Sequence, residues 1–225
     1  MANVLMGVTG SVAAIKVPEL HSLLKIAGHR VKIVATDAAL YFFDPAALDP
    51  VDARRPQRNP EVVVLDTDEW PGRDEGRRYR RGDDVLHIEL RRWAELFLIA
   101  PLDANTLAKL ALGLADNCLT CVWRAWDPSR PAVLAPAMNT LMWQHPATAR
   151  HLIQIAEDAG LSGLTRVLTA EDVVAEVNAR SAAIRVVAPE SRQLACGDVG
   201  VGALATPDRI VAVVDEQLRR DTANP

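Results

Sequence analysis

At residues 4–16 the chain reads VLMGVTGSVAAIK, in which a short apolar run leads directly into a small-residue turn and a helix start. The run Val4–Val8 has the length and composition of a buried strand. Gly10 and Ser11 open the helix, which we expect to reach about Gly28 with a kink or restart at Pro18, because proline lacks the backbone N–H. A strand, a turn and a helix in this order predict the first unit of an α/β sheet.

The same order recurs along the chain. Apolar runs that we predict as further strands occupy residues 31–35, 96–100, 132–135 and 185–189. Helical patterns alternate with them, and alternating strands and helices are typical of parallel sheets covered on both faces. We therefore predict a single α/β domain over residues 1–225. Its sheet is doubly wound and largely parallel, of the Rossmann-like or flavodoxin-like type, with flexible insertions near residues 44–84 and 162–184.

Composition limits the classes of partner. The chain has 225 residues, 49% of them hydrophobic and 24% charged, with a net charge of −4, so neither nucleic acid nor an anionic membrane is an expected partner. No apolar run approaches the ~20 residues of a membrane span, and the N-terminal stretch has no signal-peptide pattern. With three cysteines no disulfide framework is expected, and a reducing, cytoplasmic location fits.

Two of these cysteines, Cys118 and Cys121, have the spacing of a metal or redox pair. They fall in a helical pattern with Val122 and Trp126, which favours two small buried side chains. We expect no metal site.

The turn at Gly10 and Ser11 suits a phosphate, because it directs free backbone N–H groups and a hydroxyl at one point. It lacks the full glycine fingerprint of dinucleotide sites, so a mononucleotide such as FMN fits better than NAD. The alternative is a tight turn without a ligand.

A second polar position follows the strand 132–135. Here residues 136–146 read PAMNTLMWQHP, which places Asn139 at the carboxyl end of a strand, where parallel sheets bind their ligands. Its carboxamide both donates and accepts, which suits a substrate carboxylate. The alternative is a turn residue beside a core of Met138, Met142 and Trp143.

Two loops carry further candidates. Cys196 begins the glycine-rich stretch CGDVGVG, residues 196–202, and a cysteine in such a flap is seldom retained for packing. Within 44–84, arginines alternate with acids between Arg73 and Asp84. This pattern is typical of a solvated loop, and the alternative is a flap that supplies an arginine to a substrate phosphate.

Four stretches in this order resemble the flavin-containing cysteine decarboxylases. They are residues 7–13 (GVTGSVA), 100–106 (APLDANT), 136–143 (PAMNTLMW) and 194–203 (LACGDVGVGA). Residues 85–94, VLHIELRRWA, resemble the histidine segment of this family. The resemblance covers about residues 3–160 and 185–218, whereas residues near 162–184 have no counterpart. Within them, the apolar Val173, Val174 and Val177 predict a short helix over residues 171–179. The resemblance is strongest to the branch that acts in coenzyme A biosynthesis.

The resemblance implies a set of site residues. His87 and Cys196 would be catalytic, although a lone histidine is more often structural. The residues expected at FMN are Gly10, Ser11, Val12, Thr36, Phe42, Asp103, Ala104, Asn105, Thr106 and Ala137. Those expected at the substrate are Asn139, Met142, Gln193, Ala195 and Leu204. Relatives often have lysine at Gln193, so contact with an anionic substrate can differ here. Methionine is frequent at Leu204, which is a mild change that preserves volume, and serine is frequent at Asp103, although the coenzyme A branch can have aspartate there.

The implied activity is FMN-dependent decarboxylation of 4′-phosphopantothenoylcysteine to 4′-phosphopantetheine. The cysteinyl unit is oxidised to a thioaldehyde, carbon dioxide leaves, and the enethiol is reduced with a proton from Cys196. The family also implies a homotrimer with its sites between subunits. Alternatives are a decarboxylase of C-terminal peptide cysteines, a non-catalytic phosphatase-regulating subunit and a flavin prenyltransferase-like protein. The presence of His87, Asn139 and Cys196 together argues against the regulatory subunit.

Overall fold

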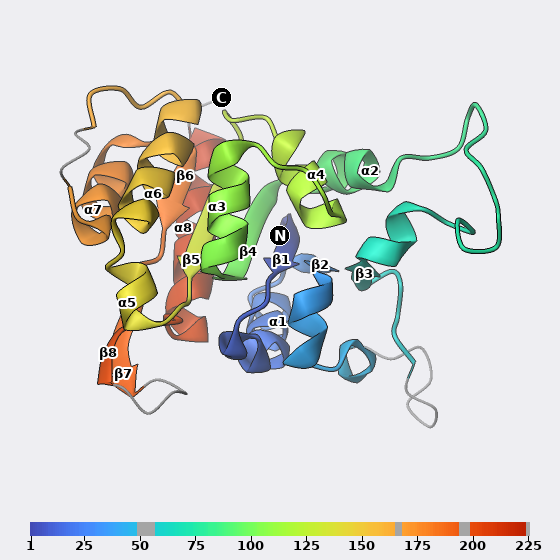
Figure 1. Ribbon diagram of the computed structural model, residues 1–225, viewed down its shortest axis with the longest axis horizontal. Helices are drawn as coiled ribbons and strands as arrows, with labels where there is room; N and C mark the ends of the chain where they lie inside the picture. Colours follow the sequence, from blue (N-terminus) through green and yellow to red (C-terminus); the bar gives the residue numbers. More distant parts are fainter. Residues whose placement is uncertain (49–56, 165–167, 194–198, 224–225) are drawn as a thin grey trace.

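A parallel sheet forms the centre of the computed structural model, which describes residues 1–48, 57–164, 168–193 and 199–223 (Figure 1). Within these ranges the sheet order is β3-β2-β1-β4-β5-β6, and every pairing is parallel. The strands are β1 (Asn3–Val8), β2 (Arg30–Ala35), β3 (Val63–Leu65), β4 (Leu96–Leu102), β5 (Ala132–Pro136) and β6 (Ile184–Val186). From β1 the chain builds the sheet first in one direction and then in the other. The predicted doubly wound α/β fold is confirmed.

The helices cover both faces of this sheet. They are α1 (Val17–Ile26), α2 (Leu86–Trp93), α3 (Ala104–Leu112), α4 (Cys118–Arg124), α5 (Thr140–Trp143), α6 (Pro146–Asp158), α7 (Ala170–Arg180) and α8 (Pro207–Ala223). Short 3-10 helices are η1 (Val12–Lys16), η2 (Asp37–Tyr41), η3 (Pro45–Ala47) and η4 (Asp66–Glu69). The expected restart at Pro18 is present, because η1 ends at Lys16 and α1 has this proline in its first turn.

Two apolar cores lie on opposite faces of the sheet. Along β1, Leu5 belongs to the core under α3, α4 and α6, while Val4 and Met6 belong to the core under α1 and α8. All three side chains are completely buried, since successive strand residues point to opposite faces and both faces are covered. Burial of each such side chain contributes about 1.5–3 kcal/mol. This double burial explains why the strands read as continuous apolar runs.

The described part of 162–184 is a packed helix and a strand. Thr169 and Asp172 form a capping box at the start of α7, and Val173 and Val177 are buried in the core beside α6. The short helix expected over residues 171–179 is present as α7, because valines at helical spacing give the segment an apolar face to bury. Flexibility of the insertion stays a prediction. The described residues of 44–84, which are 44–48 and 57–84, are mainly irregular, as expected, around η3, β3 and η4. No helix in the described ranges is long and apolar enough to cross a bilayer.

An antiparallel hairpin, β7 (Glu190–Gln193) and β8 (Val199–Ala203), packs beside the end of β5. Met138 donates its backbone N–H to the Gly202 carbonyl at 2.9 Å. Gly202 has a φ of +144°, and a Cβ there would lie 2.2 Å from the Met138 oxygen, so this approach requires glycine. The glycine-rich stretch was expected to be a flap, and its described end is instead strand β8.

Candidate functional site

The ends of β1 and β4, where the strand order reverses, are joined through Thr9. Its hydroxyl donates to the Pro101 carbonyl and accepts from the Asp103 backbone N–H, both at 2.8 Å. Next to it, a Cβ on Gly10 would lie 2.7 Å from Ala38 Cβ and 3.3 Å from Asp103 Oδ2. Three strand ends therefore meet where only glycine fits, at the edge where open α/β sheets bind ligands.

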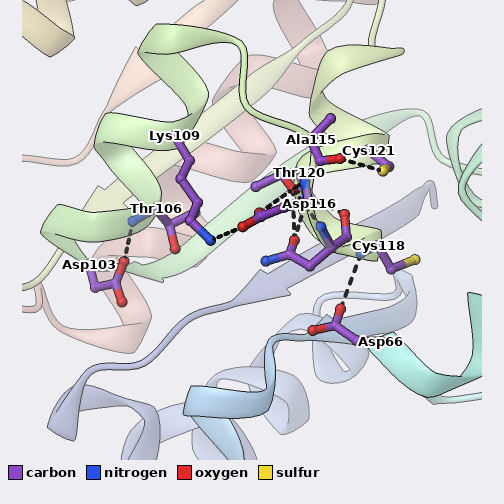
Figure 2. A network of polar contacts seen from close by, with 10 residues as sticks. Asp66, Asp103, Thr106, Lys109, Ala115, Asp116, Cys118, Thr120 and Cys121 are labelled. Atoms are coloured by element: carbon purple, nitrogen blue, oxygen red, sulfur yellow. Dashed lines mark hydrogen bonds and ion pairs between the residues drawn. The ribbon is translucent and has the colours of Figure 1, made fainter.

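Two side chains begin helices at this edge. Ser11 Oγ accepts from the Ala13 backbone N–H at 3.3 Å and donates to the Ala137 carbonyl at 3.2 Å, which links the turn after β1 to the end of β5. Asp103 Oδ1 accepts from the Thr106 backbone N–H at 2.6 Å and caps α3 (Figure 2). Asp103 Oδ2 faces Gly10, so it can accept from a hydroxyl or ring N–H of a ligand.

Thr36, directly after β2, provides a test of whether a polar ligand fits here. It is 6% exposed, and its buried Oγ1 has no hydrogen-bond partner among the described residues. Leaving such a group unpaired costs about 1–3 kcal/mol, which a ligand hydrogen bond would offset. The residues expected at FMN all follow the carboxyl ends of β1, β2, β4 and β5, so one edge of the sheet brings their segments together.

Asn139 lies on the same edge, after β5. Its Oδ1 accepts from the Leu141 backbone N–H at 2.9 Å, so it caps α5 as the turn interpretation expected. Met142 is 48% exposed on α5, whereas Leu204 is buried just after β8. Gln193 is the last residue of strand β7. Ala195 and Cys196 lie outside the described residues, so their predicted roles stay predictions.

His87 is placed elsewhere, in the first turn of α2. Its Nδ1 lies 2.5 Å from Glu69 Oε1, and its backbone N–H donates to Glu69 Oε2 at 3.2 Å. Figure 1 shows α2 and α5 on opposite sides of the molecule. One chain therefore brings Asn139 and the expected FMN residues to one edge, but it leaves His87 on the other flank.

Glu69 is a residue that sequence reasoning missed. Its segment reads as an acidic loop, and nothing in the spacing indicates a contact with a histidine further along the chain. Glu69 also borders a cavity of about 260 Å³ that contains both spaced cysteines. The other residues lining it include Asp37, Asp66 and Asp116.

The cysteines in this cavity are not activated nucleophiles. Cys118 is buried, and its backbone N–H donates to Asp66 Oδ1 at 3.1 Å (Figure 2). Burial, followed by the negative charge of Glu69, raises the pKa of the Cys118 thiol far above its usual range, and burial also raises the pKa of Cys121. The expected burial is confirmed for Cys118, whereas Cys121 is half-buried. Among the described residues, no group of three or more His, Cys, Asp or Glu side chains could hold a metal ion.

Glu69 also lines a larger cavity, of about 570 Å³. Its lining includes Trp70, Arg73, Arg77, Arg78 and Tyr79. Arg73 pairs with Asp74 at 3.2 Å and Arg77 with Asp83 at 2.9 Å, while the Arg78 guanidinium donates to the Arg77 carbonyl at 3.2 Å. The arginine-rich loop therefore faces the same buried carboxylate that contacts His87.

Comparisons with known proteins agree with the α/β fold described above. Residues 1–219 match the Flavoprotein family. Phosphopantothenoylcysteine decarboxylase of Mus musculus is 43% identical over 217 residues, which cover 96% of this chain and 87% of the relative. A cysteine-to-serine mutant of PPC decarboxylase complexed with pantothenoylaminoethenethiol superposes with a TM-score of 0.74 at 39% identity, covering 97% and 98% of the two chains. The FMN binding protein AtHal3 gives 0.69 at 40% identity, covering 96% and 95%.

Proposed function

The chain belongs to the flavoprotein family, and from that premise we propose that it is an FMN-dependent enzyme that decarboxylates 4′-phosphopantothenoylcysteine to 4′-phosphopantetheine. The relatives named above support both the cofactor and the reaction class. The observation that carries the proposal is one sheet edge where the unpaired Thr36 hydroxyl, the tight Gly10 turn and the Asn139 carboxamide follow β2, β1 and β5. This edge suits a flavin with a carboxylate substrate beside it.

The chain's own residues would have separate tasks. The segments after β1, β2 and β4 would hold FMN, and the flavin would supply two-electron redox chemistry at the carbon next to the substrate sulfur. Asn139 holds the carboxylate through its amide and adds no charge that would oppose the departure of carbon dioxide. Cys196 donates the proton that the product carbon needs, and His87 carries a proton at its Nε2.

The position of His87 supports the homotrimer expected for this family. Because α2 and α5 lie on opposite sides of one chain, a shared site needs His87 from one subunit and Asn139 from the next. Subunit complementation tests this arrangement. Co-expression of His87→Asn and Asn139→Asp chains should recover part of the activity that each variant lacks alone. A fully active monomer, or mixed assemblies without any activity, would contradict it.

The arginine-rich cavity supports phosphate recognition. Its lining includes Glu69, which contacts His87, so one buried carboxylate links the arginine-rich loop to the expected proton carrier. Arginine binds phosphate through paired charge-assisted hydrogen bonds. The dephosphorylated substrate and a peptide with a C-terminal cysteine are the comparison substrates. Faster turnover of the peptide would favour the alternative function.

The decisive experiment combines absorption spectroscopy with one variant. The purified protein should carry one flavin per chain. Under anaerobic conditions, Cys196→Ser should bleach the flavin and release carbon dioxide, yet it should accumulate the enethiol, because serine is a much weaker acid than cysteine. Cys121→Ser is the matched control and should turn over normally. Full turnover by Cys196→Ser, or a protein that takes up no FMN, would overturn the proposal.

A further inference from the structure

We propose that Glu69 is the positioning residue of His87. Its buried carboxylate holds hydrogen on Nδ1 and thereby leaves Nε2 to meet the substrate, an inference that rests on the proposed role of His87. The contact is double, because one carboxylate oxygen lies 2.5 Å from Nδ1 and the other accepts from the His87 backbone N–H at 3.2 Å. Ring and backbone are thus held together, so the imidazole is fixed in rotation as well as in place.

The two side chains of this contact are buried to different degrees. The Glu69 side chain is 3% exposed and that of His87 is 22% exposed, so the carboxylate is inside while part of the ring faces outward. A buried carboxylate needs hydrogen-bond donors, and His87 supplies two of them. An ionised carboxylate can only accept, so the Nδ1 that faces it must carry the hydrogen.

The helix that carries Glu69 is itself fixed on two sides. In η4, Asp66 accepts from the Cys118 backbone N–H of α4 at 3.1 Å. Asp68 forms a two-pronged pair with Arg58 at 2.5 and 2.9 Å and accepts from the Leu65 backbone N–H at 2.8 Å. Glu69 is therefore held by contacts on both sides of η4. A fixed acceptor is what a positioning residue requires, because a proton carrier must be oriented before it can act.

Three variants test the proposal. Glu69→Ala removes the acceptor, Glu69→Gln keeps an amide oxygen that can still accept, and Asp66→Asn changes another acid of the same short helix while keeping an acceptor for Cys118. Two measurements apply to each flavin-loaded protein. These are the nitrogen chemical shifts of labelled histidine, which report whether Nδ1 or Nε2 carries hydrogen, and the separate values of kcat and KM.

We expect His87 to carry hydrogen on Nδ1 in the wild type and in Asp66→Asn. In Glu69→Ala that preference should be lost and kcat should fall about 10- to 100-fold with KM within about threefold, by analogy with partners that orient functional histidines. Glu69→Gln should restore part of the loss. A folded Glu69→Ala protein with unchanged histidine shifts and kcat would overturn the proposal, even if it melts at a lower temperature.

The same data separate this proposal from the proposed function. If Glu69→Ala does not fold, Glu69→Met replaces it, because methionine fills the space without an oxygen acceptor, and a folded Glu69→Met protein with wild-type histidine shifts and kcat overturns the inference. If His87→Asn retains full turnover while Glu69→Ala still alters the histidine shifts, the catalytic role of His87 fails although the positioning contact is supported.

Discussion

The two flanks of the sheet place their polar residues by different means. On the flank of β1, β4 and β5, each candidate directly follows a strand, and strand ends hydrogen-bond to one another through Thr9, Ser11 and Ala137. On the flank of β3, His87 depends on Glu69, which lies before an irregular loop. One flank derives its geometry from parallel strands, whose ends meet at a common edge. The other derives it from the buried contact between Glu69 and His87.

This difference indicates where substitutions act. A substitution on the first flank lies against a crowded backbone, so it should affect both the packing of the strand ends and the binding of a ligand. A change on the second flank can uncouple one side chain and leave the sheet intact. The following predictions test that contrast, starting with the largest expected effect.

Asn139→Asp should cause the largest loss. The new carboxylate would face the substrate carboxylate and lower kcat/KM by roughly 1–4 kcal/mol, or about 5- to 1000-fold. The fold should be unchanged, because aspartate can still accept from the Leu141 backbone N–H. Steady-state kinetics together with the flavin spectrum test this prediction. Near wild-type activity would leave Asn139 as a helix cap alone.

Gly10→Ala should weaken flavin retention. The added Cβ would lie 2.7 Å from Ala38 Cβ, and such overpacking costs about 1–3 kcal/mol. Gly7→Ala, in β1 just before this turn, is the matched control, since its Cβ would meet the Leu119 side chain at 3.0 Å in the core. Flavin titration should show weaker binding for Gly10→Ala, and thermal melting should show reduced stability for both. Equal flavin affinity in the two variants would contradict the prediction.

Cys118→Ala should change stability by about 1 kcal/mol, since it trims one small buried group, and should leave turnover unchanged. Burial raises the pKa of the Cys118 thiol, so the native state keeps its proton when the unfolded state loses it. The contribution of this thiol to the free energy of unfolding is therefore fully present below a pH of about 8.5 and declines above it. Denaturant unfolding at pH 7 and pH 10 should show a smaller pH-dependent loss for Cys118→Ala. An identical decline in both proteins would refute this.

Arg78→Ala should have the smallest effect, confined to the phosphate. The side chain is exposed, so screening limits the loss to about 0.5–1 kcal/mol, or roughly two- to fivefold in KM. KM for the dephosphorylated substrate should not change. Arg92→Ala, on α2 and outside the cavity lining, is the surface control. Equal losses with both substrates would place the phosphate elsewhere.

Sequence reasoning succeeded where local pattern determines structure. The strands at 4–8, 31–35 and 132–135 and the Asn139 cap are present, because apolar runs and turn residues act over a few positions. It failed for Glu69, because that contact crosses an irregular loop that no periodicity describes. The short helix expected within the inserted segment is present as α7, since its valines lie at helical spacing and pack beside α6.

Some expectations lie beyond local pattern. Homotrimeric assembly and a cytoplasmic location stay predictions, as do the roles of Cys196 and Ala195, because these depend on other chains or on residues outside the described ranges. The site residues on the first flank share an edge, but their contacts with FMN also stay predictions.

The approach of Gly202 to Met138 has a consequence for redesign. The hairpin meets the Asn139 segment through a main-chain hydrogen bond, and its base is tied by Thr206, whose backbone N–H donates to the Glu190 side-chain oxygen Oε1 at 3.2 Å. Both contacts lie at the ends of the hairpin. Libraries that retain Glu190, Gly202 and the proposed proton donor Cys196 while varying the other residues between them should therefore alter substrate scope without rebuilding the sheet.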